Sequence, residues 1–183
     1  MRYDPVMVIA TRLSVGQFLE MPRIEERRLE LIDGEVYEKP VPTFDHGSLQ
    51  IEIGHMLAKY GRASSEARTL IPGSGFGRDS AVLPDVCFFR RESARERGHV
   101  TKPPHVAVEI LSPGQSLLEM TAKARIYLDF GVESVWLVDP DGRTVEVFEA
   151  GERRTLAGAD TLSSPSVPGL SIQVGALFET LDN

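Results

Sequence analysis

Val82-Leu83-Pro84-Asp85-Val86-Cys87-Phe88-Phe89 and, further along the chain, Val106-Ala107-Val108-Glu109-Ile110-Leu111 are the two segments most informative about the fold. Both are short apolar runs of the kind that form buried strands, and each carries one carboxylate. Burying an ionised carboxylate costs on the order of several kcal/mol unless a partner neutralises it. Two carboxylates in neighbouring core strands suggest a shared partner, and a hard divalent cation is the simplest one.

The composition indicates a globular protein with a core of its own. The chain has 183 residues, of which 42% are hydrophobic and 26% charged, so we expect one domain over residues 1–183. No apolar run reaches the roughly 18 residues of a transmembrane helix. The N-terminus also lacks the apolar region of a secretory signal, so we expect a cytoplasmic protein with no membrane partner.

The net charge and the cysteine content limit which classes of protein the chain can belong to. The net charge of −7 argues against a protein that coats nucleic acid through bulk charge. It does not exclude an enzyme that cuts nucleic acid, because a carboxylate site is itself acidic before it binds a metal. The single cysteine, Cys87, lies in an apolar run and is expected to be buried, which excludes an intramolecular disulfide and fits a reducing cytoplasm.

Capping and turn signals predict the first half of the fold. Ser14, with Gln17 three residues later, predicts a short helix over 14–21. Asp33-Gly34 between two strand-like runs predicts an N-terminal β-hairpin. Apolar residues at helical spacing predict a helix over 45–62, with His46 at the edge of its apolar face.

The second half continues with a helix over 117–130, which Gly131 ends. An apolar strand over 135–138 and an alternating strand over 144–148 are expected to pair as a hairpin, and a brief helix is expected near Leu177. The order of elements predicts an α/β (α+β) protein with a mixed central sheet flanked by helices.

Lys123 is the third candidate for the site. It lies on the predicted helix that follows the Glu109 strand, with Tyr127 one turn further on the same face. A lysine on the packed side of a helix is uncommon unless its ammonium group reaches a carboxylate or lines a cleft. Two strand carboxylates and a lysine match what metal-assisted phosphodiester cleavage needs.

Several stretches resemble the PD-(D/E)XK nuclease superfamily and, more closely, the Uma family of restriction-endonuclease-like proteins. The stretches that carry the resemblance are Glu30-Leu31-Ile32-Asp33-Gly34-Glu35, His46, Leu83-Pro84-Asp85-Val86, Val108-Glu109-Ile110-Leu111-Ser112-Pro113, 123–127 and Gly131-Val132-Glu133-Ser134-Val135-Trp136-Leu137-Val138-Asp139-Pro140. They follow the family's order through most of the chain.

The resemblance implies a restriction-endonuclease-like fold, binding of Mg²⁺ or Mn²⁺, and cleavage of DNA. It implies Asp85 and Glu109 as metal ligands. The superfamily lysine is replaced by Leu111 here, and the resemblance implies that Lys123 supplies the missing ammonium group. Other residues that would complete the site are Glu30, Glu35 and His46.

Each candidate also has a structural interpretation. Asp85 can cap a backbone group, and Glu109 can form a buried salt bridge with an arginine. Lys123 can pair with Glu119 one turn earlier on the same helix. His46 is at least as simply a core histidine. The hairpin carboxylates, Glu30 and Glu35, are more often solvated than bound to a ligand.

A basic segment follows the Asp85 strand and contains Arg90, Arg91 and Arg95. Such a segment is usually a solvated loop, but it is the best sequence candidate for contacts with the phosphates of DNA. Cutting both strands with one site per chain requires two chains, so we expect a homodimer. Two other functions stay open: a non-catalytic binding module on the nuclease fold, and a metal-dependent hydrolase of a small phosphoester.

Overall fold

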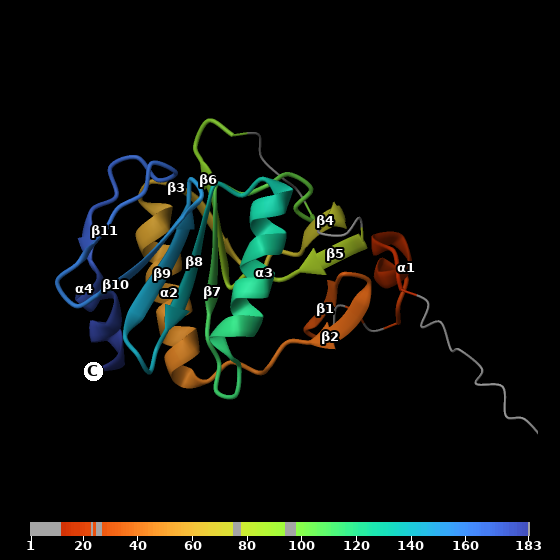
Figure 1. Ribbon diagram of the computed structural model, residues 1–183, viewed down its shortest axis with the longest axis horizontal. Helices are drawn as coiled ribbons and strands as arrows, with labels where there is room; N and C mark the ends of the chain where they lie inside the picture. Colours follow the sequence, from red (N-terminus) through yellow and green to blue (C-terminus); the bar gives the residue numbers. More distant parts are fainter. Residues whose placement is uncertain (1–11, 23, 25–26, 75–77, 94–97, 183) are drawn as a thin grey trace, which may run out of the picture.

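The computed structural model describes residues 12–22, 24, 27–74, 78–93 and 98–182. Its main element is a six-stranded sheet between two long helices (Figure 1). The strands, in the order in which they are paired, are β10 (Glu152–Ala157), β9 (Thr144–Glu149), β8 (Ser134–Asp139), β7 (Val106–Ile110), β6 (Val86–Arg90) and β3 (Gly61–Ser65). The central strands β7 and β8 are parallel and the other neighbours antiparallel, so the predicted mixed sheet is confirmed.

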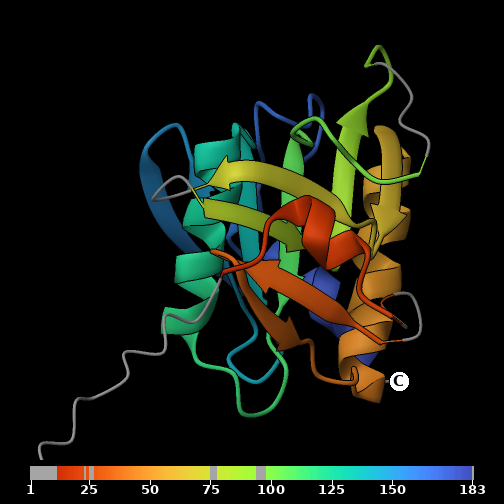
Figure 2. The ribbon, with the colours of Figure 1, turned by 90° about the vertical axis from the view of Figure 1, so that its right-hand side faces the viewer.

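A second sheet is antiparallel and contains the N-terminal hairpin. Its order is β2 (Glu35–Glu38), β1 (Leu29–Ile32), β5 (Arg78–Val82) and β4 (Thr69–Ser74). Asp33, at φ 50°, and Gly34, at φ 81°, form the turn that the sequence predicts. Figure 2 shows this sheet crossing in front of the first one, with α3 (Leu117–Phe130) to the left and α2 (Phe44–Ala58) to the right.

The remaining elements complete the ends of the fold. They are α1 (Val15–Leu19), β11 (Thr161–Leu162), β12 (Ile172–Gln173), α4 (Val174–Phe178) and the 3₁₀ helix η1 (Glu179–Leu181). The short helix expected near Leu177 is therefore present as α4. Among the described residues, no helix is both long and apolar enough to span a membrane.

Local capping explains where the helices begin and end. Ser14 caps α1 in a capping box with Gln17, as predicted, and Ser116 and Glu119 form a second box at the start of α3. Helix α3 ends at Gly131, whose φ of 103° suits a residue without a β-carbon.

Helix α2 is shorter than the sequence suggests. It begins after the cap Thr43 and ends at Ala58, and the last residues of the predicted 45–62 helix belong to β3 instead. Gly61 explains the change, because a β-carbon there would lie 2.4 Å from the carbonyl oxygen of Phe89. The missing side chain lets β3 approach β6 closely, so sheet pairing replaces the last helical turn.

Alternation along β7 sets the direction in which Glu109 points. Val106, Val108 and Ile110 pack with the apolar face of α2, whereas Ala107 packs with α3. Glu109 shares the Ala107 side, since successive strand residues face opposite sides of a sheet. The register of the fold therefore directs this carboxylate toward α3.

The apolar run 82–89 is divided between two strands, β5 and β6, and does not form one continuous strand. Asp85 lies between the end of β5 and the start of β6 and is completely buried. The preceding Pro84 has no N–H to donate to a ladder, which accounts for the break in the strand. Cys87, two residues on, is buried as expected, and burial raises the pKa of its thiol to about 11.

Candidate functional site

Charged side chains from both sheets and both long helices meet in the interior. Each is less than a tenth exposed, which is unusual for ionisable residues. The cluster consists of Glu30 on β1, Lys39 directly after β2, His46 on α2, Asp85 before β6, Glu109 on β7 and Lys123 on α3.

The two oxygens of the Asp85 carboxylate have different partners. Oδ2 accepts a hydrogen bond of 2.7 Å from the backbone N–H of Ile110 and lies 3.2 Å from Nε2 of His46. Oδ1 lies 2.6 Å from Nζ of Lys39. Asp85 thus does cap a backbone group, as its structural interpretation suggests, but only with one oxygen.

Glu109 divides its oxygens in the same way. Oε1 accepts a hydrogen bond from the Tyr127 hydroxyl and lies 2.8 Å from Nζ of Lys123. Oε2 lies 3.5 Å from Nζ of Lys39. Glu109 therefore forms its buried salt bridges with two lysines, and not with an arginine as its structural interpretation suggested.

Lys39 is the residue that the sequence analysis missed. Its Nζ donates to the carbonyl oxygen of Leu83 at 2.6 Å, so it contacts three oxygens, two from the 83–85 segment and one from Glu109. In the sequence Lys39 stands between Glu38 and Pro40, where a solvated turn lysine is the simplest interpretation. Nothing in its local pattern indicates burial.

The Lys123 side chain is buried and its ammonium group points into the cluster. Its ammonium group lies 2.7 Å from Oε1 of Glu30 and 2.8 Å from Oε1 of Glu109. Glu119, the alternative partner, instead holds the N-terminus of α3 in the capping box. Glu30 also accepts the backbone N–H of Leu83 at 2.6 Å, so this hairpin carboxylate belongs to the site rather than to solvent.

The cluster shifts the pKa values of its two strand carboxyls in opposite directions. Burial would raise the pKa of Asp85, but the Lys39 ammonium and the His46 hydrogen bond outweigh it and hold that pKa well below its usual range. For Glu109, burial dominates, and the carboxylates of Asp85 and Glu30 add to it. The pKa of Glu109 is therefore raised, even though two lysines oppose the change.

The pKa values of the groups that face Glu109 are shifted as well. Burial would lower the pKa of Lys123, but the carboxylates of Glu109 and Glu30 raise it above its usual value. Burial and the same carboxylates raise the pKa of Tyr127 well above 10, so its hydroxyl stays protonated and donates. Burial also opposes ionisation of Glu30, but Lys123 and Lys39 outweigh it and lower the pKa.

His46 and Gln50 hold the Asp85 segment from the side of α2. The Gln50 amide donates to the backbone carbonyl of Asp85 at 2.9 Å. Nδ1 of His46 is buried and has no hydrogen-bond partner in the described part of the chain. The contact with Asp85 places a proton on Nε2, from which the imidazole donates to the carboxylate.

Glu35 lies apart from the cluster. It is exposed at the hairpin, where its carboxylate pairs with Arg12 at 3.0 Å and accepts from the Tyr37 hydroxyl at 2.9 Å. The hairpin register places both glutamates on the same side of their sheet, so their positions in the sheet explain the difference. Glu35 is next to the turn on the exposed edge strand β2, whereas Glu30 is on β1, between β2 and β5.

The arginines lie at the other end of β6 from Asp85. Arg90 is five residues after Asp85 along the strand, roughly 16 Å away. Figure 1 shows the loop after β6 at the opposite end from the β7–α3 loop. Arg90 pairs with Glu133 and donates to the carbonyl oxygen of Ser166, while Arg91 donates to that of Lys59. Arg95 lies outside the described residues.

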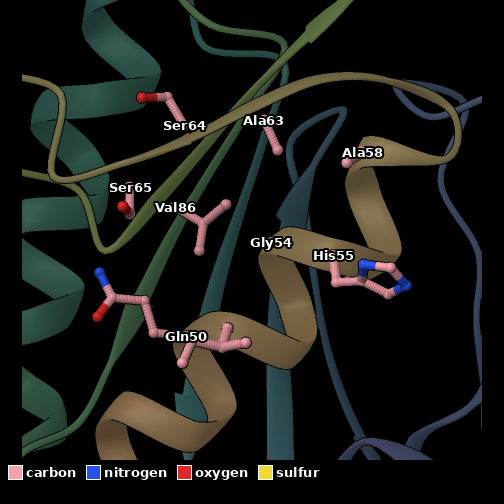
Figure 3. Close-up of a pocket in the computed structure, with 9 residues that line it drawn as sticks. Gln50, Gly54, His55, Ala58, Ala63, Ser64, Ser65 and Val86 are labelled. Atoms are coloured by element: carbon pink, nitrogen blue, oxygen red, sulfur yellow. The ribbon is translucent and has the colours of Figure 1, made fainter.

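An open groove of about 290 Å³ lies beside the cluster, between α2 and β3 (Figure 3). Gln50 and Gly54 line it from the helix, and Ser64 and Ser65 from the strand. The groove reaches Gln50, which binds the Asp85 backbone, but the carboxylates of Asp85 and Glu109 are both 0% exposed. This hollow is therefore next to the charged cluster and does not open onto it.

The fold matches a solved nuclease-like structure. The crystal structure described as "a putative nuclease belonging to DUF820" from Anabaena variabilis superimposes with a TM-score of 0.80 at 26% sequence identity. The match covers 92% of this chain and 99% of that chain. The fold of this protein is thus that of the restriction-endonuclease-like class.

The family follows from the sequence itself. The Uma2 family model, described as "Putative restriction endonuclease", matches residues 15–175, which is most of the chain. The protein belongs to the Uma2 family. A comparison with curated proteins found no match.

The oxygen atoms in the cluster fit a hard divalent cation. In the residues that the structure describes, no group of three or more His, Cys, Asp or Glu side chains is arranged to hold a metal ion. The oxygens around Lys39 Nζ are two carboxylate oxygens and one carbonyl oxygen, the donor types that Mg²⁺ and Mn²⁺ prefer. Mg²⁺ commonly binds through one or two protein carboxylates and takes its remaining ligands from water and phosphate.

Proposed function

We propose that this protein is a divalent-metal-dependent nuclease that hydrolyses DNA phosphodiester bonds. Asp85 and Glu109 would hold Mg²⁺ or Mn²⁺, with the Leu83 carbonyl oxygen as a third ligand, and Lys123 would be the charge-stabilising group. The membership of the Uma2 family and the likeness to a solved nuclease-like structure support this class of reaction.

One observation carries the proposal. In Asp85 and in Glu109, one carboxylate oxygen is held by a hydrogen bond, and the other oxygen is directed toward a position that both carboxylates share. The Ile110 N–H fixes Oδ2 of Asp85, and the Tyr127 hydroxyl fixes Oε1 of Glu109. The other oxygen of each carboxylate approaches the same ammonium nitrogen, that of Lys39. Carboxylates prepared in this way need no reorganisation to bind a cation, which is what a preorganised catalytic site requires.

A divalent cation held by these oxygens would polarise the scissile phosphate. It would also lower the pKa of a water molecule bound to it. Lys123 has a different part. Its ammonium group, held between Glu109 and Glu30 by contacts of 2.8 and 2.7 Å, remains charged because its pKa is raised. A fixed positive charge beside the ligands would offset the negative charge that develops on the phosphate oxygens.

Plasmid nicking tests the proposal directly. The wild-type protein should convert supercoiled DNA to open circles with Mg²⁺ or Mn²⁺ and not with EDTA. Asp85→Asn should slow nicking at least about a hundredfold, the scale on which a single group that stabilises charge acts. Asp141→Asn is the matched control, because Asp141 is an exposed turn residue. Equal nicking by wild type and Asp85→Asn would reject the site.

Two further outcomes separate the remaining candidate functions. Metal binding without nicking would favour a non-catalytic nucleic-acid- or protein-binding module on the same fold. Hydrolysis of bis(p-nitrophenyl) phosphate without nicking of plasmid would favour a hydrolase of small phosphoesters. Linear product from the plasmid, formed without open-circle intermediate, would instead support cutting of both strands.

We also propose that the protein acts as a homodimer of single-domain chains. Each chain carries one carboxylate cluster, and cutting both strands of a duplex requires two. Light scattering at the concentration used for nicking should give the mass of two chains. A monomeric mass together with double-strand cutting would reject this part of the proposal.

A further inference from the structure

Lys39 occupies the place that the proposed function assigns to the metal. Its Nζ lies 2.6 Å from Oδ1 of Asp85 and 2.6 Å from the carbonyl oxygen of Leu83. Glu109 Oε2 completes the set at 3.5 Å. One set of three oxygens cannot surround an ammonium group and a metal ion together.

The charges of the cluster support the same conclusion. Three carboxylates, from Glu30, Asp85 and Glu109, face two ammonium groups, from Lys39 and Lys123. Among these five groups, one negative charge remains. Adding a divalent cation while Lys39 stays would make the interior positive, whereas exchanging Lys39 for the cation leaves it balanced. Burial makes this difference matter, because charge imbalance is costly where water is excluded.

Solvent does not reach the site while Lys39 occupies it. The Asp85 and Glu109 carboxylates are completely buried, and the Lys39 side chain that contacts them is 6% exposed. A scissile phosphate cannot reach carboxylates that have no exposed surface. Departure of the Lys39 side chain would remove one of the groups that lie against both carboxylates.

The backbone of the segment that carries Lys39 is held in place, so the proposed movement is one of the side chain. This segment is the short connection 39–42 between β2 and the α2 cap Thr43, and Val41 in it is 84% exposed. Arg28 anchors its start, since the Arg28 carbonyl accepts the Lys39 N–H at 2.7 Å and its guanidinium donates to the Pro40 carbonyl. Only the long Lys39 side chain, and not the hairpin, has to leave the cluster.

We infer that Lys39 is a tethered cation that competes with the divalent metal for Asp85 and Glu109 and keeps the site closed until the metal displaces it. The inference rests on the proposed metal site. Its consequence is that apparent metal affinity in the wild type is reduced by the fraction of molecules in which Lys39 has left the site.

Mn²⁺ titration by calorimetry tests the competition without any assay of activity. Lys39→Met keeps a long apolar side chain but removes the charge, and it should bind Mn²⁺ about tenfold more tightly or better. Lys59→Met is the matched control, since Lys59 is exposed at the end of α2, and its affinity should stay within about twofold of wild type. Lys39→Met combined with Asp85→Asn should lose the tight binding.

A second measurement uses the wild-type chain and therefore does not depend on the stability of a variant. Lysine acetylation by a water-soluble reagent, followed by mass spectrometry, should be slow at Lys39 without metal. Saturating Mn²⁺ should raise the rate at Lys39 severalfold and leave Lys59 unchanged. Continued protection of Lys39 in the Mn²⁺-bound protein, or unchanged or weaker Mn²⁺ binding by Lys39→Met, would overturn the inference.

The outcomes separate this inference from the proposed nuclease activity. Nicking by the wild type, together with unchanged Mn²⁺ affinity in Lys39→Met, would reject the competition and leave the nuclease proposal intact. Tighter Mn²⁺ binding in Lys39→Met, without nicking by either protein, would support the competition and count against the nuclease.

Discussion

Oε1 of Glu109 lies 2.8 Å from the ammonium nitrogen of Lys123, although one residue is in β7 and the other in α3. The chain passes through the β7–α3 loop and two turns of helix before Lys123 reaches the carboxylate. Helix α3 thus brings an ammonium group to Glu109, which the apolar side chain of Leu111 cannot provide.

Removing the Lys123 charge should be costly for folding. In Lys123→Met, Glu109 and Glu30 both lose a buried partner, so we expect the free energy of unfolding to fall by about 3 to 5 kcal/mol. Urea unfolding followed by circular dichroism measures the loss. Lys59→Met, on an exposed position, should change the free energy by less than about 0.5 kcal/mol. A similar small change in Lys123→Met would show that the buried pairs contribute little.

The Glu30–Lys123 pair should make stability depend on pH in a defined direction. The pKa of Glu30 is lowered in the folded protein, so its contribution is complete above its unfolded pKa of about 4.3 and is lost as pH falls through the lower folded value. The pKa of Lys123 is raised, so its contribution is complete below about 10.4 and is lost as pH rises through the higher folded value.

Glu30→Gln isolates the acidic part of this dependence. Between about pH 5 and pH 3, wild-type stability should fall more steeply than that of Glu30→Gln, because only the wild type has this carboxylate to protonate. Urea midpoints measured across this range give the two slopes. Parallel slopes would mean that Glu30 is not held ionised by its lysine partners.

His46 should act as a positioning residue for Asp85. His46→Ala removes the Nε2 contact of 3.2 Å but leaves both carboxylates in place, so we expect nicking and Mn²⁺ affinity to fall by about 10 to 100-fold. His55→Ala is the matched control, since His55 is exposed on the same helix. Restored Mn²⁺ affinity in His46→Gln, which can still donate a hydrogen bond, would distinguish positioning from a general loss of structure.

The Tyr127 hydroxyl should contribute to stability through Glu109. Tyr127→Phe keeps the buried ring and removes one donor to the buried Glu109 carboxyl group, so we expect a loss of about 1 to 3 kcal/mol. Tyr37→Phe removes an equivalent hydroxyl–carboxylate contact at the exposed Glu35 and should cost less than about 0.5 kcal/mol. Thermal unfolding of the two variants measures both. Equal losses would contradict the role of burial.

Much of the fold is readable in local sequence signals. Ser14 with Gln17, Asp33-Gly34 and Gly131 each specify a cap or turn through groups that are close in the chain, and the structure confirms all three. The prediction for α2 was wrong at its end, because Gly61 is required by contact with β6 rather than by any local pattern.

The site is readable only in part. Asp85, Glu109 and Lys123 stand out because a charge in an apolar pattern needs a partner, and the structure brings them together. Glu30 and Glu35 look alike in the sequence, and the order of strands in the second sheet decides that Glu30, on the inner strand β1, meets the cluster while Glu35, on the edge strand β2, stays exposed. Lys39 has no such signal, because its neighbours Glu38 and Pro40 are exposed.

The sequence by itself determined that this protein has two buried carboxylates in need of a cation, and the order of strands and helices that carries them. Only the tertiary structure decided that Lys39 and Lys123 are the cations that meet them, since the two lysines come from a hairpin and a helix on separate layers. The physical reason is that periodicity and capping act over a few residues. The distance from Lys39 to Glu109, by contrast, depends on how the second sheet packs across the first.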